Sequence, residues 1–114
     1  MLEGVARRHG LQLSVAALPT CGWIDGVWSA MSGPACTEAQ AQWYGPVMDA
    51  IDPDIVVLTH RVLDEPGSPT IVLGEGTDFL KTGTKAFDDL VEQRTRATVA
   101  RFRKEGRKVV IIEP

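Results

Sequence analysis

The sequence lacks the features that would assign it at once to a well-marked class of protein. No apolar run approaches the ~20 residues that a membrane-spanning helix needs. With 12 basic and 15 acidic residues, the chain has no excess of positive charge to attract nucleic acid. The GxSxG, GxGxxG and phosphate-loop motifs are all missing. These absences remove a spanning helix, a nucleic-acid partner, a nucleophile elbow and a dinucleotide-binding loop from the hypotheses.

Cysteine is scarce too, since Cys21 and Cys36 are the only two. Two cysteines cannot supply the four ligands of a structural zinc site, and neither histidine stands at finger spacing. We therefore predict no metal and no cofactor. Both cysteines lie in a segment rich in Gly, Pro and Ser. A disulfide there would stabilise the folded state by roughly 3 kcal/mol, because it restricts the unfolded chain. Such a bond implies an oxidising compartment, and the alternative is two unrelated buried thiols.

Local patterns predict an alternation of helices and strands. Residues 2–9 indicate a helix that ends at Gly10, because basic residues fill its last turn and glycine suits a left-handed stop. Residues 11–18 (LQLSVAAL) indicate a strand, and residues 19–35 a long loop. Thr37 is typical of an N-cap for a helix that runs to about Ile51, with a kink at Gly45-Pro46.

The second half of the chain repeats this alternation. Ile55–Leu58 and Val109–Ile112 are continuous β-branched runs, as in strands covered on both faces of a parallel sheet. Residues 60–78 are irregular, with a short strand expected at Thr70–Leu73. A long helix is expected from about Thr84 to Glu105, ended by Gly106, with an apolar side made of Ala86, Leu90, Val91, Ala97, Val99, Ala100 and Phe102.

This order predicts a three-layer, flavodoxin-like α/β fold, with a parallel sheet and helices on both faces. Three strands would leave an apolar edge unpaired. Residues 1–114 are therefore expected to be one partial domain, truncated at both ends.

In an open parallel sheet, ligands bind beyond the carboxyl ends of the strands. His60 and Arg61 directly follow one predicted strand, where they either meet an anionic group or simply cap the strand. Gly22 follows another and either donates its backbone amide to an oxyanion or forms a tight turn. Trp23 and Trp28 either line an acceptor groove or pack beneath the loop. The basic residues from Arg94 to Lys108 indicate a solvated helix face.

Several of these segments resemble an SGNH (GDSL-type) hydrolase-like domain, in the version fused to membrane acyltransferase family 3 proteins. The similar stretches are RHGLQLSVAALPTCGW with a second cysteine at Cys36, then IDPDIVVLTHR, then a long helix and RKVVIIEP. They span nearly the whole chain. The family's serine block and its DxxH block do not occur in these residues, and His60 and Arg61 stand where its GxND asparagine is expected.

The resemblance implies O-acyl transfer or ester hydrolysis on a cell-envelope glycan, by a Ser-His-Asp mechanism in the full protein. It implies a glycan acceptor, an acyl donor and a membrane acyltransferase domain of the same parent chain. The location would be the extracytoplasmic side of a cell membrane. No catalytic residue lies in this chain, so the fragment alone is expected to be inactive. Two alternatives remain: a non-catalytic α/β module that binds a glycan or a partner, and a receiver-like domain, for which the acceptor aspartate is missing.

Overall fold

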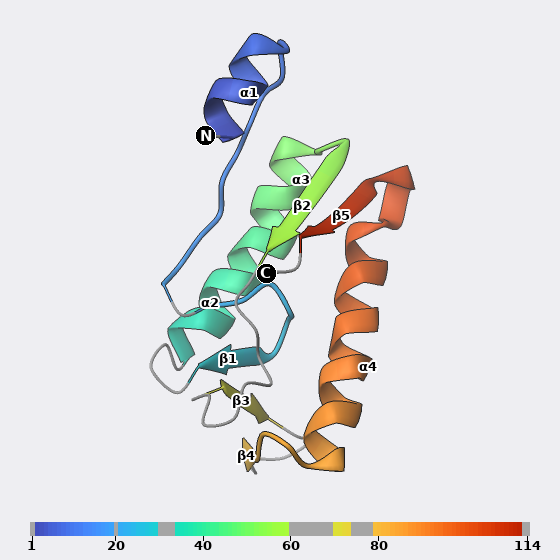
Figure 1. Cartoon of the computed structure of the whole chain (residues 1–114). Coiled ribbons are helices and arrows are strands. Elements are labelled where there is room, and N and C mark those ends of the chain that lie inside the picture. The colour runs from blue at the N-terminus through green and yellow to red at the C-terminus, as the bar shows by residue number, and fades with distance from the viewer. Residues whose placement is uncertain (1, 20, 30–33, 60–69, 74–78, 113–114) are drawn as a thin grey trace.

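The computed structural model describes residues 2–19, 21–29, 34–59, 70–73 and 79–112. Helix α1 (Leu2–Arg8) opens the chain and stands apart from the other elements (Figure 1). Gly10 follows it with φ of +66°, a backbone conformation that glycine adopts without strain. The predicted first helix and its glycine stop are therefore confirmed. The radius of gyration is 14.9 Å, above the about 13 Å expected for a compact domain of this length, in keeping with a helix α1 that stands apart.

The strand predicted at Leu11–Leu18 is wrong. These residues have no regular secondary structure, and their apolar side chains from Leu11 to Ala17 are exposed, Val15 by 77%. The segment runs as an extended connection from α1 to the rest of the molecule (Figure 1). A strand exists only where a neighbour accepts and donates its backbone hydrogen bonds, and among the described residues this segment has no such neighbour.

The second helical region starts three residues before the predicted N-cap at Thr37. It consists of α2 (Pro34–Gln42), a π-helical turn at Trp43–Val47 and α3 (Met48–Ile51). Proline has no N–H to donate, so Pro46 breaks the α-helical ladder, and the Met48 N–H bonds to the Trp43 carbonyl instead. The predicted interruption at Gly45-Pro46 is thus confirmed as a π-helical turn.

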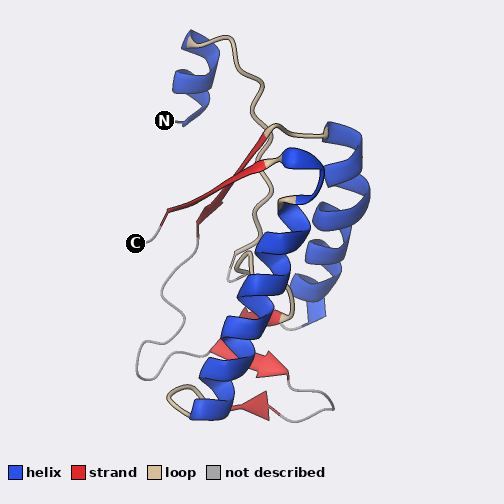
Figure 2. Ribbon diagram, turned by 90° about the vertical axis from the view of Figure 1, so that its right-hand side faces the viewer, coloured by secondary structure: helices blue, strands red, loops and turns tan. Residues whose placement is uncertain are grey.

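Strands β2 (Ile55–Thr59) and β5 (Lys108–Ile112) pair in parallel, with Val57 opposite Val110. Helices α2, α3 and α4 (Lys85–Phe102) lie on the same side of this two-stranded sheet (Figure 2). The opposite face carries apolar side chains that remain half exposed, such as Ile55 (54%) and Ile112 (47%). The result is a mixed helix-and-strand fold with a small parallel sheet, compatible with the α/β class.

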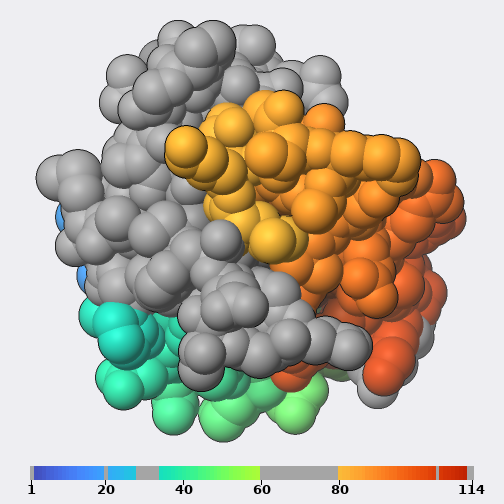
Figure 3. Space-filling model, turned by 90° about the horizontal axis from the view of Figure 1, so that it is seen from below, coloured from blue at the N-terminus to red at the C-terminus, as the bar shows by residue number. Residues whose placement is uncertain are grey.

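A second sheet lies at the other end of the molecule. Strand β1 (Val27–Ser29) pairs antiparallel with β3 (Thr70–Leu73), which pairs antiparallel with β4 (Phe79–Leu80). The short strand expected at Thr70–Leu73 is confirmed, whereas β1 falls in the segment predicted as loop. The same end is seen face on in Figure 3, where the residues from β4 through α4 form a continuous surface.

Helix α4 begins as predicted, because the Thr84 hydroxyl accepts a hydrogen bond from the Phe87 N–H. The α-helix ends at Phe102 and a 3₁₀ turn at Lys104–Gly106 follows. Its fully buried residues are Phe87, Thr98 and Phe102. The predicted apolar side was therefore partly wrong, because Phe87 and Thr98 were omitted from it while Ala86 is exposed.

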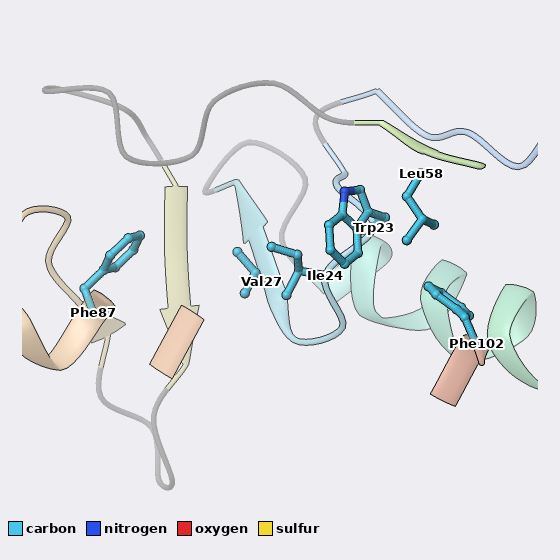
Figure 4. Close-up of a cluster of buried hydrophobic side chains, with 6 residues drawn as sticks. All are labelled: Trp23, Ile24, Val27, Leu58, Phe87 and Phe102. Atoms are coloured by element: carbon cyan, nitrogen blue, oxygen red, sulfur yellow. The ribbon is translucent and has the colours of Figure 1, made fainter. Parts of the chain in front are cut away.

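The buried core joins the loop after residue 20 to the helices and to β2. It contains Trp23, Ile24, Val27, Leu58, Phe87 and Phe102 (Figure 4). Within the described ranges, none of the helices is both long and apolar enough to cross a bilayer.

Candidate functional site

The loop of residues 21–26 is tied covalently to helix α2. Cys21 and Cys36 form a disulfide, with 5.3 Å between their Cα atoms. The predicted disulfide is therefore confirmed, and the alternative of two separate thiols is wrong. The bond anchors the start of the loop to the first turns of α2, where Cys36 is buried.

Gln40 holds the remainder of the same loop. Its side chain is fully buried, and its Nε2 donates to the carbonyls of Gly22 and Ile24, both at 2.9 Å. Its Oε1 accepts from the Gly26 N–H at 3.2 Å. A buried amide that satisfies its own groups and three backbone groups fixes the loop conformation, because any rearrangement would leave polar atoms unpaired.

The loop also contacts α4 and the end of β2. The Asp25 N–H donates to the Thr98 hydroxyl at 3.1 Å, and this hydroxyl donates to the Arg94 carbonyl at 2.7 Å. Trp23 and Ile24 share a buried cluster with Leu58, the penultimate residue of β2 (Figure 4). The loop therefore lies at the carboxyl end of a parallel strand, the edge at which we expected a site.

Tyr44, in the π-helical turn, supports the loop from beneath. Its hydroxyl donates to the Trp23 carbonyl at 2.6 Å, and its ring meets Phe102 edge to face, with 4.8 Å between centroids. Burial raises the pKa of this phenol, and the nearby Asp25 carboxylate raises it further, while Arg101 acts in the opposite direction. The phenol is therefore neutral at physiological pH and serves as a hydrogen-bond donor.

Between the loop and α4 there is a pocket of about 170 Å³, lined by Asp25, Arg94, Ala97, Thr98 and Arg101. Arg101 lies 3.8 Å from the Asp25 carboxylate and also faces the Tyr44 ring, 5.9 Å from its centroid. Arg94 is half-buried, in contrast to the predicted solvated face. The pocket combines two guanidinium groups with one carboxylate.

The residues predicted from sequence are only partly brought together. Gly22 lies in the loop held by Gln40, and no acceptor among the described residues takes its amide hydrogen. Trp23 is buried in the core, so little of its indole is accessible to a sugar ring, and its place in an acceptor groove stays a prediction. His60, Arg61 and the side chain of Trp28 lie outside what the structure describes.

Sequence reasoning missed Gln40 and Tyr44, and it also missed that Arg94 and Arg101 of α4 line one pocket. One available signal was the spacing of Cys36 and Gln40, which places both on one face of a helix. In the part of the chain that the structure describes, no group of three or more His, Cys, Asp or Glu residues is arranged to hold a metal ion. No protein-family model, no curated protein and no solved structure matches the chain.

Proposed function

We propose that this chain is the middle portion of an SGNH-type domain that transfers an acyl group to a cell-envelope glycan, or removes one from it. The observation that carries the proposal is the position of the 21–26 loop beside the carboxyl end of β2. Ligands of open parallel sheets bind beyond that edge. A glycine-bearing loop fixed there by Cys36 and Gln40 supports a role for the Gly22 amide as an oxyanion donor.

The proposed fold is the three-layer, flavodoxin-like sheet of that family. Parallel sheets are normally covered on both faces, yet one face of the β2–β5 pair leaves Ile55, Val57 and Ile112 about half exposed. The extended and unpaired Leu11–Leu18 segment is a further apolar stretch without a partner. Both observations support additional strands and a second helical layer in the complete protein.

The chemistry would be divided between this chain and the rest of the protein. The serine nucleophile, the histidine base and the orienting aspartate come from blocks that these 114 residues do not contain. The Gly22 amide would donate to the oxygen that becomes negative as the serine attacks the ester carbonyl. The acyl donor and the membrane acyltransferase domain would be partners of the parent chain, and the disulfide agrees with an extracytoplasmic location.

The test is acyl-ester turnover by the whole gene product that carries these residues, measured with a small acetyl ester. Replacing Gly22 by proline removes the amide hydrogen, whereas Gly22→Ala keeps it. We expect Gly22→Pro to lower kcat by about 10²-fold or more, and Gly22→Ala to lower it far less. Thermal unfolding of both variants serves as the folding control. Absence of turnover in the unmodified protein, or equal loss in both variants, would refute the proposal.

A further inference from the structure

The pocket between the 21–26 loop and α4 contains a guanidinium group that lacks a carboxylate partner. Five ion pairs occur among the described residues, and none of them includes Arg94. Arg96, two residues further along α4 and on a different side of it, is exposed and pairs with Glu92. A half-buried guanidinium with no ion-pair partner among the described residues keeps its donors available for an anion that enters the pocket from outside.

Gly26 brings the Arg94 side chain against the loop backbone. Its φ is +80°, and a Cβ added at this position would lie 2.5 Å from the Nη1 of Arg94. Only glycine therefore permits both this loop conformation and this approach of the guanidinium. A movement of the loop away from Arg94 would break the hydrogen bond from the Gly26 N–H to the Gln40 Oε1. The Arg94 guanidinium therefore lies against the loop backbone at Gly26, and no carboxylate among the described residues neutralises its charge.

Arg101 lies two helical turns from Arg94 on the same side of α4, about 10 Å along the axis. It forms a long ion pair with Asp25, with 3.8 Å between the guanidinium Nη1 and the carboxylate Oδ2, and both side chains are 43% exposed. With two guanidinium groups and one carboxylate, the pocket carries a net charge of +1. A carboxylate ligand matches that charge, whereas a phosphate group with about 1.5 to 2 negative charges would exceed it and would meet Asp25.

We propose that this pocket binds the carboxylate of a small hydroxylated acid, specifically an acidic sugar unit. Arg94 and Arg101 bind the carboxylate through charge-assisted hydrogen bonds. Asp25 accepts hydrogen bonds from sugar hydroxyls. Thr98 lines the pocket, but its hydroxyl already accepts from the Asp25 N–H and donates to the Arg94 carbonyl, so we assign it no contact with the ligand. The volume of about 170 Å³ is below the roughly 300 Å³ at which pockets for larger ligands begin, so one sugar unit enters rather than a cofactor.

This inference does not rest on acyl transfer, and binding is its only readout. The whole gene product that carries these residues is titrated with sodium glucuronate, glucose, acetate and inorganic phosphate, and binding is followed by calorimetry. We expect saturable binding of glucuronate, weaker binding of acetate and none of glucose. Arg94→Gln should weaken glucuronate binding about tenfold or more, and the control Arg96→Gln should leave it unchanged. Asp25→Asn removes the carboxylate that competes for Arg101, so it should strengthen acetate binding; it should strengthen glucuronate binding less, because the acceptor for the sugar hydroxyls becomes weaker.

A second pair of variants separates recognition from folding. Arg94→Lys keeps the charge but loses the planar fork, and Gly26→Ala keeps both arginines but displaces Arg94; both should weaken glucuronate binding. Thermal unfolding identifies any variant that fails to fold, and the binding comparison then uses the others. No saturable binding of glucuronate by the unmodified chain would overturn the proposal. Tighter binding of phosphate than of glucuronate, or equal weakening by Arg94→Gln and Arg96→Gln, would also overturn it.

Discussion

Cys36 and Gln40 lie one turn apart on α2, and together they hold residues 21–26 through one covalent bond and three hydrogen bonds. The disulfide secures the first residue of the loop, and the glutamine amide secures the carbonyls of Gly22 and Ile24 and the Gly26 N–H. The loop has little regular secondary structure, and these attachments to α2 fix its conformation. Both the proposed oxyanion donor and the proposed anion pocket depend on this attachment.

Replacement of Gln40 by leucine should be severely destabilising. The leucine side chain fills a similar space but leaves two carbonyls and one N–H without their partner, each at a cost of about 1 to 3 kcal/mol. We expect a total loss of roughly 3 kcal/mol or more in the free energy of unfolding, measured by urea denaturation. Gln42→Leu, at an exposed position of the same helix, should change stability little. Similar losses in the two variants would show that the Gln40 hydrogen bonds contribute nothing specific.

Reduction of the Cys21–Cys36 disulfide should lower the free energy of unfolding by roughly 3 kcal/mol, because it releases a 15-residue loop in the unfolded chain. The measurement is urea denaturation with and without a reductant. A double variant with alanine at both positions should be less stable and insensitive to the reductant. Detection of two reactive thiols in the native, unreduced protein would contradict the bond itself.

Stability should fall at alkaline pH because of Tyr44. The raised pKa means that the folded state keeps the phenol proton after the unfolded state begins to lose it near 10.0. Below that pH the two states bind the proton equally, and above it stability decreases by up to about 1.4 kcal/mol per pH unit. Tyr44 is the only tyrosine, so tyrosinate absorbance in the native protein reports this group alone.

Tyr44→Phe is the matched variant for this pH dependence. It should cost about 1 to 3 kcal/mol at neutral pH, because the buried Trp23 carbonyl loses its donor. It should also remove the part of the alkaline decline that the phenol causes. A native tyrosinate titration at the ordinary pKa, or an unchanged alkaline slope in the variant, would argue against burial of this hydroxyl.

Asp52 should tolerate asparagine far better than valine. Its φ is +46° at the end of α3, and its carboxylate accepts a hydrogen bond from the nearly buried Arg107 at 3.1 Å. Asparagine keeps a side-chain oxygen that can accept the Arg107 hydrogen bond, and position 52 is 74% exposed, so this substitution should cost about 1 kcal/mol. Valine should cost about 1 to 2 kcal/mol more, because a β-branched residue resists the left-handed conformation. Thermal denaturation of the two variants would reveal the difference, and equal stability would contradict it.

Sequence patterns predicted the local elements whose causes are themselves local. Gly10 ends α1, Thr84 caps α4 and Pro46 interrupts the α2–α3 helix because each acts through its own backbone geometry or its immediate neighbours. The disulfide was also predictable, since a loop rich in glycine and proline contained the only two cysteines. The strand at Leu11–Leu18 was predicted wrongly. An alternation of apolar and polar residues favours a strand only when the edge of another strand is available to pair with it, and none is paired with this segment in the described residues.

The candidate site depended on long-range contacts that no pattern encodes. The spacing of Cys36 and Gln40 puts them on one helix face and so separates Gln40 from Gln42, but it does not show that Gln40 is fully buried and bonded to the loop while Gln42 is exposed. Arg94 belongs to a stretch whose composition is typical of a solvated face, yet it is half-buried and lies against the loop at Gly26. The burial of such residues depends on which segments contact each other in the folded chain, and local sequence patterns do not show these contacts.

From its residues alone, the chain determined that IVVL and VVII would be strands and that one long helix would connect them, because β-branched runs and helix caps act within a few residues. Only the tertiary structure decided that a loop would be held on α2 by Cys36 and Gln40 and that Arg94 and Arg101 would line one pocket with Asp25. The physical reason is that burial and hydrogen-bond satisfaction belong to the assembled molecule. A side chain acquires them from partners that can be many residues away, as the Thr98 hydroxyl does when it accepts a hydrogen bond from the Asp25 N–H.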